Sequence, residues 1–145
     1  MASSLLEAVD IKAPVAVTWS LWENVERWPA FLSHVKHVQR VDESTFAWQV
    51  SLPAADKEFV AELTEVIPRE RIAWRTTEGV HHAGVVTFHR LSDTESRVTL
   101  QIEYDPQGFV EHLGALTNLD KTLANYDLGE FQRMAEREAG TAERP

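Results

Sequence analysis

The sequence of 145 residues contains no cysteine, and this absence removes several kinds of chemistry. Disulfides, thiolate nucleophiles and cysteine-ligated zinc or iron–sulfur centres are all excluded. The chain has only six glycines, and they form no phosphate-binding run, so nucleotide chemistry is not expected. Any catalysis must therefore use His, Asp, Glu, Tyr, Ser, Thr or Lys.

Long apolar runs and basic residues are also scarce. No run approaches the roughly 18 apolar residues that span a bilayer, and residues 1–17 lack the basic region of a secretory signal. Fourteen basic residues stand against 23 acidic ones, and the formal net charge is -9, which disfavours binding to a phosphate backbone. We expect a cytoplasmic protein with no nucleic-acid partner and no stable membrane insertion.

The length fits one domain. We place this domain at residues 1–138 and expect a flexible polar tail at residues 139–145. A strand is predicted over residues 5–14, followed by an amphipathic helix over residues 14–28 that starts at a proline. A second short helix is expected over residues 28–35, restarting after Pro29.

Between residues 36 and 105 the apolar pattern changes to a period of two, interrupted by short turn-like segments. Such short links make consecutive strands antiparallel neighbours, because a parallel crossover needs a dozen or more residues. The pattern therefore predicts a curved meander. Its six strands are expected at residues 36–42, 45–52, 58–67, 71–77, 81–91 and 96–105.

The last third of the chain, residues 109–138, is predicted to be helical and to pack on the sheet through one apolar stripe. Thr117 and Asn118 offer a cap for a restart near Leu119, so one helix or two separate segments are both compatible with the sequence. The stripe consists of Phe109, Leu113, Leu116, Leu123, Ala124, Leu128, Phe131 and Met134.

This order of elements resembles the START-like superfamily, also called SRPBCC, and in particular its polyketide cyclase/dehydrase-like branch. The resemblance is carried by the segments IKAPVAVTWSLWENVERWPAFLSHVKHV, AELTEVIPRERIAWRT, AGVVTFHRL, RVTLQIEYDPQG and LGEFQRMAERE, which together span nearly the whole chain. It implies an α+β helix-grip fold, in which a seven-stranded antiparallel curved sheet wraps around a long C-terminal helix. Two short helices lie between the first and second strands.

The resemblance also implies a cavity between the concave sheet and the last helix that holds a hydrophobic small molecule. No catalytic residue is carried over from the family. Strand parity nevertheless predicts which side chains face such a cavity. The inward positions are Phe46, Trp48, Val50, Leu52, Ile72, Trp74, Thr76, Val98, Leu100, Ile102 and Tyr104.

The same parity separates two adjacent histidines at the head of a strand. Val86 and Phe88 face inward, which carries His82 and Gly84 inward and leaves His81 outward. The missing side chain of Gly84 leaves room for a ligand or lets the strand bend around the last helix. Aromatic residues at strand parity are also ordinary core residues. The predicted ligand-binding residues are Trp28, Phe31, Trp48, Trp74, Gly84, Phe88, Tyr104, Leu113 and Leu116.

Few polar residues have inward parity. His82 paired with Tyr104 offers a proton-transfer couple for aldol-type cyclisation and dehydration, and the alternative is a hydrated histidine at the cavity rim. Asp120 and Asp127 lie within the apolar stripe of the last helix, and a carboxyl facing a dry cavity would have a raised pKa and act as a general acid. The candidate catalytic residues are therefore His82, Tyr104 and Asp127.

Structural roles compete with this reading of the two aspartates. A helix restart near Leu119 places Asp120 in a first turn, where it favours the helix dipole. Asp127 is also placed to pair with an arginine such as Arg40, Arg75 or Arg90.

A metal site is not expected. His34 and His37 are three residues apart, but the sequence shows no third ligand for them. We also expect no cofactor.

Three functions remain open. The first is binding of a hydrophobic or aromatic molecule that is polyketide-like, quinone-like or lipid-like. The second is a metal-independent aromatase/cyclase or dehydratase acting on a poly-β-keto substrate by proton transfer and cavity templating. The third is an interaction protein with a filled core. The expected partners are the hydrophobic small molecule and a polyketide synthase or another protein that tolerates the acidic surface. Monomer and homodimer are both compatible with the sequence.

Overall fold

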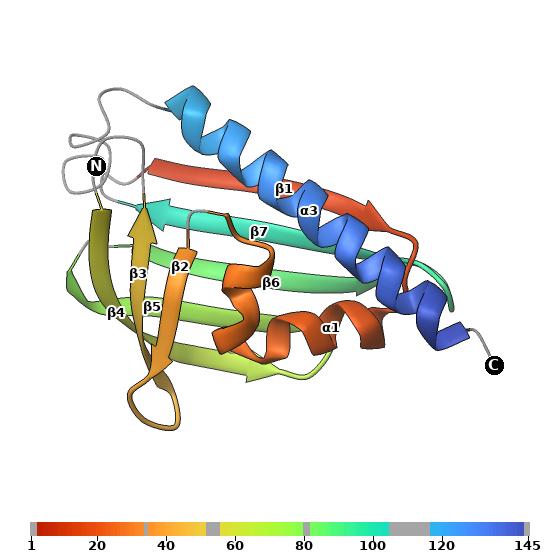
Figure 1. Cartoon of the computed structure of the whole chain (residues 1–145), viewed down its shortest axis with the longest axis horizontal. Coiled ribbons are helices and arrows are strands. Elements are labelled where there is room, and N and C mark those ends of the chain that lie inside the picture. The colour runs from red at the N-terminus through yellow and green to blue at the C-terminus, as the bar shows by residue number, and fades with distance from the viewer. Residues whose placement is uncertain (1–2, 34, 52–55, 80–81, 105–116, 144–145) are drawn as a thin grey trace.

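The computed structural model describes residues 3–33, 35–51, 56–79, 82–104 and 117–143, and Figure 1 shows their arrangement. For residues 3–5, 104, 117–125 and 141–143 it describes the backbone alone. A curved antiparallel sheet forms one layer, and the helices of the described chain lie across its concave face (Figure 1). None of these helices combines the length and apolar character that a membrane span requires.

The sheet has seven strands in the order β1-β7-β6-β5-β4-β3-β2. From β3 to β7 each strand pairs antiparallel with the strand before it in the sequence, and β1 pairs antiparallel with β7. This arrangement confirms the predicted meander of six strands and the seven-stranded antiparallel sheet that the resemblance implied. The strands are β1 (Ser3–Ile11), β2 (Val35–Arg40), β3 (Thr45–Ser51), β4 (Asp56–Ile67), β5 (Arg71–Gly79), β6 (His82–Arg90) and β7 (Ser96–Tyr104).

Burial alternates along the strands as the sequence predicts. In β3, Phe46, Trp48 and Val50 are buried while Gln49 is exposed. In β5 and β6 the alternation is the same, so one face of the sheet carries the core and the other faces solvent. Leu52, for which we also predicted an inward position, lies outside the described residues.

The helical connection between β1 and β2 differs in part from the prediction. Helix α1 (Val15–Glu23) begins directly after Pro14, as predicted. The second helical segment is a 3₁₀ helix, η1 (Val25–Ala30), which contains Pro29 instead of starting after it. Two contacts explain this earlier start. The side chain of Asn24 accepts a hydrogen bond from the Glu26 N–H at 3.2 Å, and the Trp28 indole N–H donates to the Trp22 carbonyl at 2.9 Å.

The long helix α3 (Thr117–Glu143) packs against β1 and α1. It begins at the pair of residues that we proposed as a cap for a restart. Leu128, Phe131, Ala135 and Ala139 are buried at helical spacing and face the sheet. Residues 139–143 are helical, so the helix runs past the predicted tail boundary at residue 138. The reason is that buried Ala139 continues the apolar stripe for a further turn.

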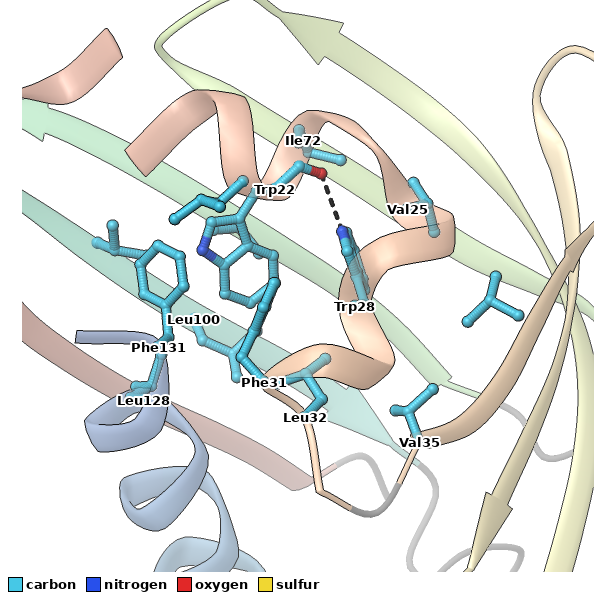
Figure 2. Packing of buried hydrophobic residues seen from close by; sticks show 14 of the residues in the cluster. Trp22, Val25, Trp28, Phe31, Leu32, Val35, Ile72, Leu100, Leu128 and Phe131 are labelled. Atoms are coloured by element: carbon cyan, nitrogen blue, oxygen red, sulfur yellow. Dashed lines mark hydrogen bonds between the residues drawn. The ribbon is translucent and has the colours of Figure 1, made fainter. Parts of the chain in front are cut away.

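Trp22 lies at the centre of the core that joins these layers. Figure 2 shows its ring between Phe31 and Phe131, with Trp28 of η1 beside it. The ring centroids lie 5.0 Å from Trp28, 4.8 Å from Phe31 and 5.3 Å from Phe131, all in edge-to-face geometry. Leu128 packs from α3 against the same group (Figure 2). Aromatic side chains therefore connect α1, η1 and α3.

An ion pair on the surface ties β1 to β7. Asp10 and Arg97 are register partners, and the guanidinium donates to both carboxylate oxygens, at 2.6 and 3.2 Å. This hydrogen bonding lowers the pKa of Asp10 below its usual value. A lowered carboxyl pKa stabilises the folded state above the pKa of the unfolded chain, and this contribution is lost as the pH falls through the folded-state pKa.

We predict that Arg97→Gln raises the pKa of Asp10 toward its ordinary value. The measurement is an NMR pH titration of the side-chain carboxyl carbons. Asp42 provides the internal control, because its lowered pKa comes chiefly from the Ser44 backbone N–H and not from Arg97. An Asp10 titration curve that does not change in the variant would contradict the assignment.

Candidate functional site

Three aromatic rings line the concave face where β3, β4 and β5 lie side by side. We call Trp48, Phe59 and Trp74 the aromatic wall. Trp48 and Phe59 are register partners, and their rings stack with a centroid distance of 5.4 Å and an interplanar angle of 19°. Trp48 and Trp74 are stacked at 6.5 Å and 24°. The three rings are thus close to parallel and present one continuous apolar surface.

Trp28 packs against the wall from the helical layer. Its ring meets Trp48 edge-on at 5.1 Å and Trp74 edge-on at 5.2 Å. Phe31 packs deeper, between Trp22 and Phe131. The structure therefore places Trp28 against the wall on the side of the helical layer and Phe31 in the core between η1 and α3, and the ligand-binding role of both residues stays a prediction.

Gly84 has a specific relation to Trp74. The two residues are register partners in β5 and β6, and the indole ring lies on the glycine backbone. A Cβ atom built on Gly84 would lie 2.1 Å from Cζ2 of Trp74, far inside van der Waals contact. The space beside Gly84 that we proposed for a ligand is thus occupied by the Trp74 ring. Gly84 determines where the third ring of the wall sits.

His82 lies at the edge of the aromatic wall and points inward, as parity predicts. It is half-buried, and its ring meets Phe59 edge-on at 4.6 Å and 90°. Thr76 holds the His82 backbone on both sides, because its hydroxyl accepts from the His82 N–H at 3.1 Å and donates to the His82 carbonyl at 3.2 Å. The backbone that carries the imidazole is therefore fixed next to the wall.

The sheet register brings His82 and Tyr104 together. They are directly opposite each other in the β6–β7 ladder, and opposed residues on one face have Cβ atoms about 4.5–5.5 Å apart. The sequence predicted both for the same proton-transfer couple, and the backbone places them as neighbours. His81, Leu113 and Leu116 lie outside the described residues.

Phe88 lies apart from this group. It is six residues further along β6 than His82, which corresponds to about 20 Å of extended strand. Its ring packs edge-on against Trp19 of α1 at 5.3 Å. Phe88 is therefore near the opposite end of the core, and a ligand that touches His82 would need to be long to reach it.

Asp127 is buried in α3 and holds the segment that follows η1. One oxygen, Oδ1, accepts from the Ser33 backbone N–H at 3.0 Å and from the Ser33 hydroxyl at 2.7 Å. Arg40, Arg75 and Arg90, which we considered as partners, instead pair with other acidic residues. Asp120 falls in the first turn of α3, the position that the helix-dipole alternative requires.

Two inward residues were missed by our reading of the sequence. Phe59 completes the aromatic wall, and the alternation of Phe59 and Ala61 in β4 would have identified it. Glu7 in β1 shares the inner face with Val9 and Ile11, is half-buried, and has a buried Oε1 atom. It places a carboxyl group on the concave face, and the parity of the first strand was sufficient to find it.

Two buried indole N–H groups have no hydrogen-bond acceptor among the described residues, those of Trp22 and Trp48. Figure 2 shows the Trp22 nitrogen on the side of the ring that faces Phe131, in the core between α1 and α3. The Trp48 ring stacks nearly parallel to Phe59 and Trp74 and meets Trp28 edge-on. A buried donor without an acceptor costs about 1–3 kcal/mol.

A separate groove of about 350 Å³ lies on the outer face of the sheet. Its polar side chains come from positions that alternate with Trp48 and Phe59 and therefore point away from the core. Among the described residues no three metal-binding side chains gather, in this groove or elsewhere. The groove is lined by His37, Gln39, Ala47, Trp48, Gln49, Glu58, Phe59, Val60, Glu78 and Gly79.

The curved sheet, the long helix across it and the aromatic concave face define a helix-grip protein of the START-like class. The chain belongs to the family described as "Polyketide cyclase / dehydrase and lipid transport", whose sequence profile matches residues 11–133. It is 36% identical over 135 residues to an uncharacterised 17.2 kDa protein of Streptomyces lincolnensis from the melC2-rnhH intergenic region. That match covers 92% of this chain and 90% of the relative.

Solved structures show the same fold. An aromatase/cyclase, Zhui, from Streptomyces sp. R1128 superposes with a TM-score of 0.85 at 16% identity, covering 100% of both chains. A START superfamily protein from Mycobacterium smegmatis gives 0.73 at 11% identity, covering 96% of this chain and 98% of the other. A Deinococcus radiodurans protein gives 0.74 at 24% identity, covering 94% and 99%.

We predict that Gly84→Ala moves the Trp74 ring and destabilises the chain by about 1–3 kcal/mol, since the added methyl group overpacks the wall. Chemical denaturation measures the stability, and near-UV circular dichroism reports the stacked indoles. Gly140→Ala is the matched control. Gly140 is exposed in α3 with open space around it, so alanine there raises stability by about 0.5–1 kcal/mol. Equal effects of the two substitutions would refute the packing argument.

Proposed function

We propose that the chain binds a flat, hydrophobic small molecule, polyketide-like or quinone-like, against the aromatic wall on the concave face. The observation that carries this proposal is the stack of Trp48, Phe59 and Trp74 with half-buried His82 at its edge. Parallel aromatic rings recognise a flat apolar ligand by stacking, and ligand sites are mostly apolar with a few polar groups.

The burial of the inner face indicates where a ligand would enter. Val86 and Val98 on β6 and β7 are completely buried, whereas His82 and Ile102, nearer the end where β6 begins, are half-buried. Accessible apolar surface on the inner face is thus found beside His82. We place the ligand there, and a cytoplasmic location is compatible with a chain that has no disulfides.

The expected affinity follows from the apolar area. A three- or four-ring ligand that buries about 300 Å² gains about 7 kcal/mol at about 25 cal/mol per Å². Association and ordering remove part of this gain, so the dissociation constant should be near micromolar unless polar anchors contribute.

Binding is tested by quenching of tryptophan fluorescence with a naphthoquinone, menadione, and with oleate as a lipid comparison. We expect menadione to bind, and Phe59→Leu to weaken it about tenfold because the variant removes a ring of the wall. Phe46→Leu is the control, since Phe46 is buried on the inner face of the same strand pair but packs under Arg40. Binding of neither probe would leave the interaction protein as the better hypothesis, and binding of oleate alone would exclude an aromatic site.

A second candidate function is aromatase/cyclase or dehydratase chemistry on a poly-β-keto chain delivered by a polyketide synthase. The register pairing of His82 with Tyr104 favours it, and the fold relative from Streptomyces sp. R1128 is an aromatase/cyclase. In this proposal the imidazole removes a proton from the carbon that forms the new bond, and the phenol donates to the ketone oxygen that becomes the hydroxyl. The proton-transfer role of Asp127 stays a prediction, and in the structure its Oδ1 accepts two hydrogen bonds from Ser33.

For this candidate we predict that His82→Ala and Tyr104→Phe each lower the yield of cyclised product about a hundredfold in a reconstituted polyketide synthase assay. His89→Ala is the matched control, because His89 is exposed on the outer side of the same strand. Unchanged rate and product distribution in both site variants would exclude this chemistry and leave the binding proposal in place.

A further inference from the structure

The indole N–H of Trp48 is a buried hydrogen-bond donor whose acceptor is missing from the described chain. Trp48 is 4% exposed, and its Nε1 atom finds no acceptor. The two tryptophans that pack against Trp48, which are Trp28 and Trp74, do not have such an unpaired donor. Trp28 donates to the Trp22 carbonyl at 2.9 Å, and Trp74 is not among the residues with a buried orphan atom. Trp22 is the other tryptophan whose indole nitrogen lacks an acceptor among the described residues, but its ring packs against Phe31 and Phe131 in the core. Within the aromatic wall, Trp48 is the tryptophan with the missing acceptor.

The packing around Trp48 leaves the ring no freedom to turn its N–H elsewhere. Phe59 and Trp74 stack nearly parallel to it, at 19° and 24°, and Trp28 meets it edge-on. Three neighbouring rings therefore fix the indole plane. An acceptor must come to the N–H in that plane, because the donor cannot swing toward solvent.

The chemistry of an incoming acceptor follows from the surroundings. An apolar wall excludes a strongly hydrated group such as a free carboxylate unless a cation accompanies it, and the cation–π contact found among the described residues lies elsewhere, between Arg40 and Phe46. A neutral oxygen on an aromatic ring system meets both requirements, because its ring stacks and its oxygen accepts. A ketone or quinone carbonyl has this chemistry.

We infer that the Trp48 indole N–H donates to a carbonyl oxygen of the bound ligand, so that the site selects aromatic ketones and quinones over aromatic hydrocarbons. This inference rests on the proposed function, since it requires a ligand at the aromatic wall. It adds that one side-chain donor determines whether the site prefers ring systems with a carbonyl oxygen or ring systems without one. Trp48 is thus a specificity-determining residue.

The test compares two probes that differ only in two carbonyl groups, anthraquinone-2-sulfonate and anthracene-2-sulfonate. Wild-type protein should bind the quinone roughly tenfold more tightly, the ratio expected for one net hydrogen bond. Trp48→Phe keeps a stacking ring but has no N–H, so it should bind both probes equally. Trp19→Phe is the control, because Trp19 pairs with Phe88 away from the wall and should leave the preference intact.

A second measurement needs no variant. In ¹⁵N-labelled wild-type protein, which has five indole N–H groups, the Trp48 resonance should move downfield with the quinone and not with the hydrocarbon. The Trp28 resonance should stay in place, because its bond to the Trp22 carbonyl is already made.

The outcomes separate the inference from the function on which it rests. If both probes bind equally to wild type, or if the Trp48 proton is already hydrogen bonded to water and does not respond to the quinone, the inference is overturned and ligand binding stands. If neither probe binds, the proposed function and the inference fail together. A quinone preference that survives in Trp48→Phe also overturns the assignment.

Discussion

The position of Trp28 is the constraint on which the concave face depends. Its indole N–H donates to the Trp22 carbonyl, which closes the turn between α1 and η1. The same ring meets Trp22 on one side and Trp48 and Trp74 on the other. One side chain thus joins the helical layer to the sheet and supports two of the three rings of the aromatic wall. A change in the η1 turn would move the surface that faces a ligand.

Most of the fold could be predicted from the sequence because its strands are buried on one face only. Period-two alternation follows directly from such burial, and it gave all seven strands and the inward side chains of β3, β5 and β6. The start of η1 could not be predicted in this way. It depends on a side-chain cap and on an indole bond over six residues, and both overrode the usual effect of Pro29.

The candidate site was predictable to the extent that it follows parity. The alternation around Val86 and Phe88 predicted that the His82 side chain points inward. The same alternation in β1 and β4 would have identified Glu7 and Phe59 as inward residues. The contact between Trp74 and Gly84 was beyond such a rule, because parity gives the face of a residue and not the direction of its ring along the sheet. Parity also cannot show that the Trp48 N–H lacks an acceptor, because this depends on the positions of the neighbouring polar atoms.

The contact of the Trp74 ring with the Gly84 backbone restricts how the shape of the aromatic wall can change. The two positions share one volume, since the indole occupies the place that a side chain at position 84 would take. A smaller residue at position 74 would make room for a side chain at position 84, whereas the tryptophan present here requires glycine opposite it. If the large side chain were on β6 and the small residue on β5, the apolar surface would move from β5 to β6. The same fold would then have a ligand site of a different shape.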